Sequence, residues 1–266
     1  MSRSMAPALL CLHLGVHKTA TTYIQSVLER SDWREGYFYI GPWVSRESII
    51  SRDPGLADIV PDVIRRDDIV VLSDENLLGN AAAGLAFYPR PERHLAWARQ
   101  LKVSICLCVR DYADFLSSAW VESLRHGAFR PQARKVRNGG YVGLLERLER
   151  LLPNADFFVW NYASFRDRRD EILDRISSHG LAKLAVDGVG DQRPSPSCGV
   201  VTTYLQLRNL VEGPKQAELM KKLISNQNIR GNEGKFNGYS EEDRRVLSQQ
   251  FATDLEIIKS RYRILR

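Results

Sequence analysis

Cysteine is scarce in this chain, and metal-ligand clusters are missing from its sequence. Only 4 of its 266 residues are cysteine, at Cys11, Cys106, Cys108 and Cys198. Cys106 and Cys108 stand two residues apart in an apolar run, so both are expected on one face of a strand. Their spacing fits neither a disulfide framework nor a zinc site. We therefore expect buried reduced thiols, a reducing compartment and no bound metal.

Long apolar runs are also missing. The run over residues 6–14 contains His13 and is too short to span a bilayer. No cleavage site of the signal-peptide type follows it, and the next residues carry a motif of their own. We expect no signal peptide, no membrane span and a cytoplasmic location.

The imbalance of charge is small. A net charge of +6, with 44% hydrophobic and 26% charged residues, is ordinary for a globular protein and excludes disorder. The charge permits an anionic partner, but the basic residues are scattered and lack an aromatic platform, which disfavours nucleic acid. No Ser/Gly linker divides the chain, so residues 1–266 are expected to form a single domain.

Apolar runs alternate with helical patterns along the first two thirds of the chain. Strands are predicted at residues 8–14, 37–40, 69–72, 103–109 and 157–160. Apolar residues at helical spacing follow Lys18, follow Arg110 and fill residues 141–152, where Pro153 ends the pattern. The alternation predicts an α/β fold of three layers, with a central parallel sheet and helices on both faces.

The final third has a different pattern. A turn is predicted at 194–197, a helix at 201–211, and a glycine-rich loop at 231–238. A long helix follows, with Ser240 as its cap and three acidic residues in its first turn.

The first strand leads through a short loop into the first helix. Gly15 ends the strand, Lys18 lies in the loop, and Thr19, Thr21 and Thr22 add hydroxyl groups. Helix N-termini bind phosphate through free N–H groups and the helix dipole. A nucleotide-triphosphate loop of the G-x-x-x-x-G-K-[ST] type needs more residues and a second glycine. An isolated Gly-x-x-Lys-Thr is usually a plain turn, but this position favours a site for one 5′-phosphate.

The segment HLGVHKTATTYIQ, residues 13–25, resembles the 5′-phosphosulfate loop of the sulfotransferases that use 3′-phosphoadenosine 5′-phosphosulfate (PAPS). The similarity is greatest to bacterial members with H-x-G-x-H-K-T-G-T-T-x-x-Q. It implies a sulfotransferase fold related to P-loop nucleotide kinases, PAPS as donor, PAP as product and no metal. The residues that it implies for the donor site are His17, Lys18, Thr19, Ala20, Thr21 and Thr22. Ala20 departs from this pattern, because many members of the family have glycine there.

A second motif follows the strand at 103–109. Arg110 ends that strand, where ligands bind in open parallel sheets, and Ser118 lies eight residues further on. An arginine side chain can bind phosphate through two parallel hydrogen bonds. The pair resembles the family's 3′-phosphate motif, so the resemblance covers residues 8–30 and 103–120. By itself, Arg110 can equally pair with Asp111 or Asp114.

Transfer to a hydroxyl needs a proton acceptor, and Lys18 would stabilise the charge that develops during in-line displacement. In the glycan sulfotransferases that the chain resembles, a glutamate just past a strand is the proposed base, and Glu75 matches that position. Asp74, His17 and His13 remain alternatives. Glu75 can equally be a carboxylate that caps a helix start.

Two basic segments have open roles. Residues 125–137 carry five cationic side chains and no acid, which suits an acceptor cleft, a lid or a solvated loop. Arg230 and Lys235 of the glycine-rich loop do not reproduce the Arg-Lys-Gly motif of cytosolic sulfotransferases.

The sequence thus predicts a sulfotransferase with catalytic Lys18, Glu75 and His17. The expected acceptor is a carbohydrate or glycolipid hydroxyl, while a small alcohol and tyrosine stay open. A P-loop small-molecule kinase and a non-catalytic nucleotide- or glycan-binding protein are the alternatives.

Overall fold

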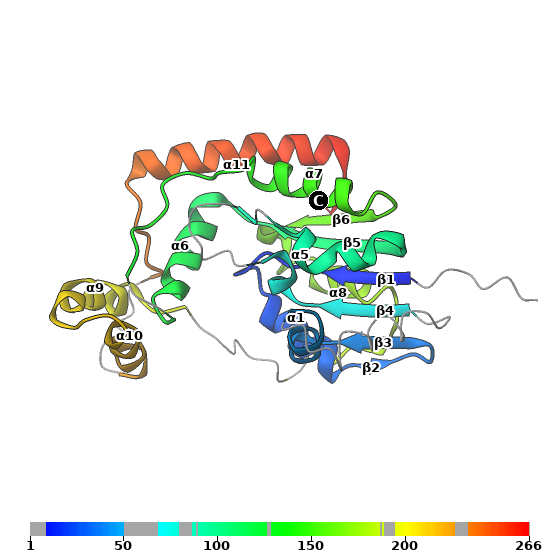
Figure 1. The fold of residues 1–266 in the computed structure, drawn as a ribbon, viewed down its shortest axis with the longest axis horizontal. Helices are drawn as coiled ribbons and strands as arrows, with labels where there is room; N and C mark the ends of the chain where they lie inside the picture. The colour runs from blue at the N-terminus through cyan, green and yellow to red at the C-terminus, as the bar shows by residue number, and fades with distance from the viewer. Residues whose placement is uncertain are drawn as a thin grey trace, which may run out of the picture.

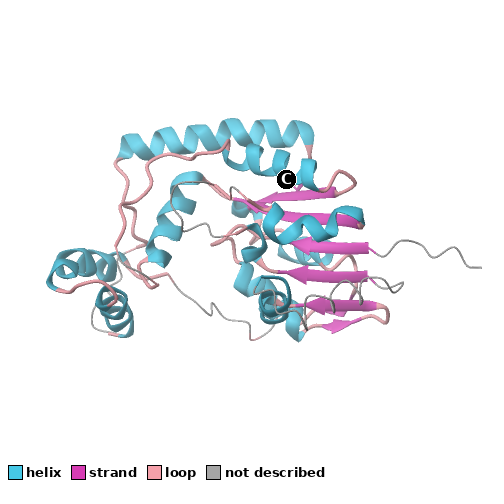
Figure 2. Ribbon diagram, viewed as in Figure 1, coloured by secondary structure: helices cyan, strands magenta, loops and turns pink. Residues whose placement is uncertain are grey.

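The computed structural model describes residues 9–50, 69–79, 87–88, 90–126, 129–186, 188, 195–226 and 234–265. Its centre is a parallel sheet in the strand order β3-β4-β1-β5-β6-β8 (Figures 1 and 2). The strands are β1 Leu9–His13, β3 Tyr37–Ile40, β4 Ile69–Ser73, β5 Lys102–Val109, β6 Asp156–Asn161 and β8 Arg263–Leu265. The predicted α/β fold with a central parallel sheet is confirmed. Ala8, predicted to begin the first strand, lies outside the described residues.

The order of the strands places β1 between β4 and β5. Leu10 pairs with Val70 on one side and with Val103 on the other. From β1 the chain crosses towards β3, and from β5 it crosses the opposite way towards β6. The carboxyl ends of β1 and β5 therefore flank the point where the direction of winding reverses, which is where open α/β sheets bind ligands.

Helices cover both faces of the sheet (Figure 1). The helices are α1 Thr21–Arg30, α2 Pro42–Ser45, α5 Glu92–Leu95, α6 Tyr112–Ser123, α7 Gly140–Leu151, α8 Arg169–Ile176, α9 Cys198–Leu207, α10 Lys215–Ser225 and α11 Glu241–Arg261. Shorter turns of helix are Arg46–Ile50, Glu75–Leu78, Ala96–Gln100, Tyr162–Ser164 and Arg208–Leu210. A two-stranded antiparallel sheet joins β2 Asp32–Trp33 to β7 Leu181–Lys183.

Alternate residues of each strand enter opposite cores. Leu10 and Ile105 belong to the core against α5, α6, α7 and α11. Cys11, Cys106 and Cys108 belong to the core against α1 and α8. The expected common face of Cys106 and Cys108 is therefore confirmed. The four cysteines are free thiols, and the expectation of burial is wrong for Cys198, which is partly exposed at the start of α9.

A smaller core joins α9 and α10 to the end of α6. Val121 of α6 and Leu124, which follows the helix, pack with Val201, Tyr204 and Met220. Both helices lie away from the sheet, at the far left of Figure 1. The helix predicted for 201–211 begins three residues earlier, because Ser197 caps it by accepting from the Val200 N–H.

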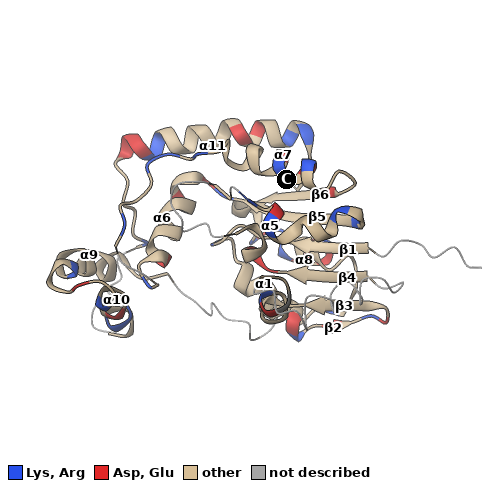
Figure 3. Ribbon diagram, in the orientation of Figure 1, with Lys and Arg blue, Asp and Glu red and all other residues tan. Residues whose placement is uncertain are grey.

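Helix α11 follows the predicted charge pattern. The Ser240 hydroxyl accepts from the Asp243 N–H at 3.1 Å, which confirms the predicted cap. Acidic residues begin the helix and basic residues end it, so both ends complement its dipole (Figure 3). Among the described residues, no helix has the length and apolarity needed to cross a membrane.

Candidate functional site

The loop between β1 and α1 has an unusual backbone. Gly15 has a φ of +25°, and a Cβ there would lie 2.3 Å from Thr21 Cγ2, so any larger residue would collide. Lys18 and Ala20 also have positive φ, at 67° and 62°. The left-handed conformation is energetically unfavourable for L-residues, and residues strained in this way are common at functional sites. Ala20 therefore occupies the conformation that suits the glycine of the sulfotransferase motif.

The hydroxyls of the loop have different surroundings. Thr19 is fully buried and its hydroxyl donates to the Val16 carbonyl, so it closes the loop. Thr21 is buried in the first turn of α1, and Thr22 is half-buried beside it. Ala20 provides no side-chain cap for α1, and the first turn contains no acidic residue. The N-terminal N–H groups of α1 thus form an end that suits an anion.

Arg110 connects this loop to the end of β5. The arginine is buried, and its Nη1 donates to the Lys18 carbonyl. Its guanidinium carbon lies 4.7 Å from the centre of the Tyr162 ring, a cation–π contact. Among the described residues, Arg110 Nε has no hydrogen-bond partner. A buried arginine with an unused donor fits an anionic ligand.

A cavity of about 240 Å³ begins at Arg110. Its lining brings together residues from three distant parts of the chain, namely Arg110, Asp114, Ser117, Ser118, Val121, Ser195, Pro196, Lys235, Phe236, Asn237 and Arg244. Arg110 and Ser118, predicted to hold one phosphate, thus line the same cavity. The cations Lys235 and Arg244 add positive charge, while Arg244 Nη2 lies 3.5 Å from the Asp114 carboxylate.

Lys235 reaches the cavity through backbone pairing. Its strand-like bridge to Ser197 is antiparallel, and the Cys198 N–H donates to the Gly234 carbonyl at 3.1 Å. The sequence predicted a glycine-rich loop here, but Lys235 did not match the Arg-Lys-Gly motif of cytosolic sulfotransferases. Arg244 had no signal in the sequence, because it lies on a helix whose position depends on the tertiary fold. Arg230 lies outside the described residues.

The basic segment 125–137 runs beside this cavity. Gln132 Nε2 donates to the Ser117 hydroxyl at 3.0 Å, and the Arg130 carbonyl accepts from Trp120 Nε1 at 2.7 Å. Both partners belong to α6, the helix that carries Ser118. Residues 127 and 128 of the segment lie outside the described part. The described remainder thus contacts α6 beside the cavity.

The Lys18 ammonium extends towards α6. It donates to Glu122 Oε2 of α6 at 2.9 Å. Burial alone would raise the pKa of the Glu122 carboxyl, but the adjacent Lys18, Arg125 and His126 outweigh it, and the pKa is lowered. Glu122 was not predicted as a site residue, because nothing in the sequence distinguishes it from the other acidic residues of the chain.

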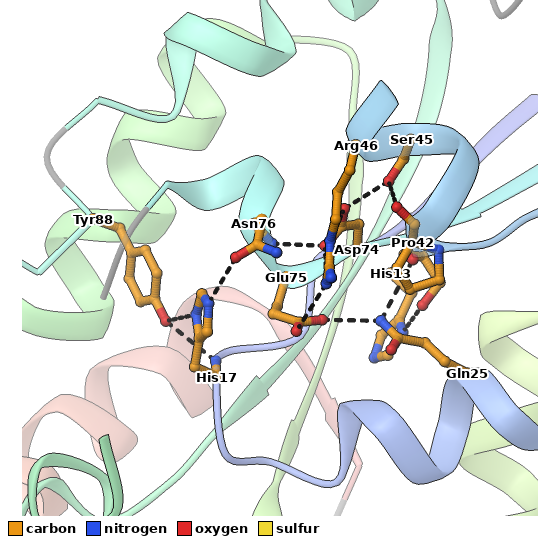
Figure 4. Close-up of polar contacts among 11 residues, drawn as sticks. His13, His17, Gln25, Pro42, Ser45, Arg46, Asp74, Glu75, Asn76 and Tyr88 are labelled. Carbon is orange, nitrogen blue, oxygen red and sulfur yellow. Dashed lines mark hydrogen bonds and ion pairs between the residues drawn. The ribbon is translucent and has the colours of Figure 1, made fainter. Parts of the chain in front are cut away.

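Glu75 lies at the start of the helical turn after β4. Figure 4 shows its carboxylate between the side chains of Gln25 and Arg46. Gln25 Nε2 donates to it at 2.9 Å, and Arg46 Nη2 lies 3.4 Å away. Burial opposes ionisation, but the charges of His17 and Arg46 and the hydrogen bonds lower the pKa of the carboxyl. Glu75 is thus a carboxylate at neutral pH, held in a defined orientation.

The Asp74 carboxylate accepts hydrogen bonds from three residues. It is fully buried, accepts from Arg46 at 3.2 Å through both oxygens, and accepts from the Ser45 hydroxyl at 2.6 Å. It also caps the next turn by accepting from the Asn76 N–H at 3.0 Å. Asp74 is therefore a structural carboxylate that fixes Arg46, and the alternative that it is the base is not supported by its surroundings.

His17 lies between two polar partners (Figure 4). Its Nδ1 is 2.9 Å from the Tyr88 hydroxyl and its Nε2 is 3.0 Å from the amide of Asn76. The amide satisfies both neighbours when its nitrogen donates to His17 and its oxygen accepts from Arg46 at 2.9 Å. Tyr88 and Asn76 therefore fix the ring of His17 on the side of the loop that faces Glu75.

His13 occupies a different position, behind the loop. It is buried, its Nδ1 lies 2.7 Å from the Ser73 hydroxyl, and its ring stacks on Trp160. Burial is the main cause that lowers the pKa of His13 to about 4. His13 therefore supports the wall of the sheet under Gly15 as a neutral ring.

Among the described residues, no group of three or more histidines, cysteines or carboxylates is arranged to hold a metal ion. The site thus consists of a cationic loop, a cationic cavity joined to it by Arg110, and an oriented carboxylate.

No family model and no curated protein matches the chain. A comparison with solved structures aligns it with a sulfotransferase from Alicyclobacillus acidocaldarius, at 12% identity over 85% of this chain and 99% of that one. The TM-score of this alignment is 0.38.

Proposed function

We propose that this chain is a sulfotransferase that uses PAPS as donor and an acceptor hydroxyl as second substrate. The observation that carries the proposal is Arg110, whose side chain joins the Lys18 loop to the cavity lined by Ser118. PAPS carries a phosphate at the 3′ position and a phosphosulfate at the 5′ position of one ribose, so it needs two adjacent anion sites. The cavity and the Lys18 loop would supply them. When bound, PAPS supplies a sulfuryl group on a phosphosulfate linkage and leaves as PAP.

The loop would hold the 5′-phosphosulfate end. Gly15 allows the backbone to come close, the N–H groups of α1 point to the loop, and Lys18 supplies a charge. His17, Thr21 and Thr22 lie around the same turn, with Ala20 in the left-handed conformation between them. Thr19 keeps the loop closed.

The cavity would hold the 3′-phosphate. Arg110 has an unpaired Nε, and Ser118, Lys235 and Arg244 add donors on the other walls. Charge-assisted hydrogen bonds of this kind are about twice as strong as neutral ones. The charges of the cavity therefore suit a phosphate dianion.

Glu75 is the proposed proton acceptor. Its carboxylate is ionised at neutral pH and is oriented by Gln25 and Arg46. Asp74 holds Arg46 and His17 borders the loop, so both residues orient the groups around Glu75. The acceptor is proposed to be a carbohydrate or glycolipid hydroxyl, because the position of Glu75 matches the glutamate of glycan sulfotransferases. The three buried thiols favour a reducing compartment.

The test is ligand protection from thermal unfolding. PAP without metal should raise Tm by several degrees, because a ligand at about 100 times its Kd stabilises by about 2.7 kcal/mol. ATP with magnesium should protect less, since the loop is too short for a magnesium triphosphate. Protection by ATP with magnesium and none by PAP would instead support the kinase alternative.

A further inference from the structure

Lys18, the cation of the proposed donor site, already has a carboxylate partner. Its Nζ lies 2.9 Å from Glu122 Oε2, and the two side chains are 21% and 23% exposed. Glu122 follows Ser118 by one turn of α6, so both side chains project from the same face of the helix. A negative charge therefore lies at the boundary between the proposed 5′ and 3′ phosphate sites.

This arrangement is unfavourable for an anionic donor. The half-buried Glu122 carboxylate repels phosphate, and it also occupies the ammonium group that would bind the phosphate. Charges near a protein surface interact more strongly than they do in bulk water, so neither effect is fully screened. An anion that binds at Lys18 therefore competes with Glu122 for the N–H donors of the ammonium group.

Two features make such a replacement feasible. Glu122 has two further partners, because Arg125 Nη1 lies 3.5 Å from Oε2 and His126 Nε2 lies 3.3 Å from Oε1. The carboxylate therefore keeps partners after Lys18 leaves. The loop also keeps its anchor, since Arg110 holds the Lys18 carbonyl and not its side chain. Only the flexible stem of Lys18 has to move.

We propose that Glu122 is a positioning residue that holds Lys18 in the ligand-free chain and releases it to the 5′-phosphate end when the nucleotide binds. This inference rests on the proposed function. Glu122 keeps Lys18 directed across the site while it is empty. It also weakens the hold on PAP, which favours release of the product after transfer.

The first measurement is calorimetric titration of PAP, without metal, into wild type and Glu122→Gln. The variant should bind PAP about five-fold more tightly, since it loses a pair that competes with the ligand, and a half-buried ion pair is worth this order of magnitude. A merely structural role would give equal or weaker binding. Glu122→Asp should bind like the wild type, because it keeps the charge.

The matched control is Glu146→Gln. Glu146 forms an ion pair with Arg261 between α7 and α11, outside the candidate site. The substitution changes the net charge by the same amount, so its PAP affinity should equal that of the wild type. Equal tightening in both variants would show a general charge effect and would overturn the role of Glu122.

A second readout follows Lys18 itself. Acetylation by a water-soluble ester, measured by mass spectrometry of the Lys18 peptide, should be several-fold faster in ligand-free Glu122→Gln than in wild type. Saturating PAP should protect Lys18 in both proteins. An equal rate in the two ligand-free proteins would overturn the inference.

The experiments distinguish failure of the role of Glu122 from failure of the proposed donor site. Binding of PAP to wild type with no tightening in Glu122→Gln overturns the role of Glu122 and leaves the donor site standing. No binding of PAP to the folded wild type overturns the proposed function, and the exchange of partners with it.

Discussion

At the residue scale, Arg110 contacts the Lys18 loop and also lines the cavity. Arg110 is one of the few charged residues that are buried. Its Nη1 donates a hydrogen bond to the Lys18 carbonyl, while its Nε has no hydrogen-bond partner among the described residues. Buried donors are normally paired, and an unpaired one is costly. The unused donor of Arg110 is therefore available to an anionic ligand in the proposed site.

Glu75 gives a prediction at the same scale. Its pKa is lowered in the folded chain, so its ionised form stabilises the fold above the usual glutamate pKa of about 4.3, and this contribution is lost as the pH falls through the lower folded value. Glu75→Gln should lower the free energy of unfolding by about 1 kcal/mol at pH 7, and the difference should shrink below about pH 4. Urea unfolding at pH 7 and pH 3 measures both values.

The control for Glu75 is Glu29→Gln, at an exposed position near the end of α1. A surface substitution of this kind should change the free energy of unfolding by less than about 0.5 kcal/mol at both pH values. A cost of Glu75→Gln that is the same at pH 3 and pH 7 would contradict the ionised, hydrogen-bonded state of Glu75.

At the element scale, the loop between β1 and α1 combines the strand end, the helix start and three positive φ angles. Ala20 has a φ of 62°, which costs an L-residue about 1 kcal/mol and costs glycine almost nothing. Ala20→Gly should therefore leave the free energy of unfolding unchanged or raise it by up to about 1 kcal/mol. Thermal or urea unfolding of the ligand-free protein measures the change.

The matched variant is Ala252→Gly, at an exposed position within α11. Glycine in a helix interior costs about 1 kcal/mol relative to alanine, so this substitution should destabilise. An equal loss of stability in both variants would show that Ala20 is not strained in the folded chain.

The elements that the sequence predicted are those with a strong local signal. Residues 103–109 are apolar almost throughout, and they form a strand with one flanking residue added. Helix α10 was missed, although its apolar residues Leu219, Met220, Leu223 and Ile224 recur at helical spacing and join the core with α9. Strand β8 was missed as well, since three residues at the edge of a sheet carry little pattern.

At the scale of the whole molecule, the candidate site depends on which strands are neighbours. The sequence indicates that Lys18 and Arg110 each follow a strand, but the adjacency of β1 and β5 arises only from the winding of the chain. Lys235 and Arg244 come from the last quarter of the chain and enter the same cavity through tertiary packing. No local pattern could assign them, whereas the loop and Arg110 could be proposed from their motifs.

The central claim is that the Lys18 loop and the Arg110 cavity bind the two ends of one nucleotide. Calorimetric titration of PAP without metal into wild type, Lys18→Ala and Arg110→Ala tests it most directly, with circular dichroism to verify folding. Arg245→Ala, which removes an exposed arginine of α11, is the control for charge. We expect micromolar binding to wild type and to the control, and at least about tenfold weaker binding to both site variants, equal to about 1.4 kcal/mol. Equal affinity in all four proteins, or no binding to the folded wild type, would contradict it.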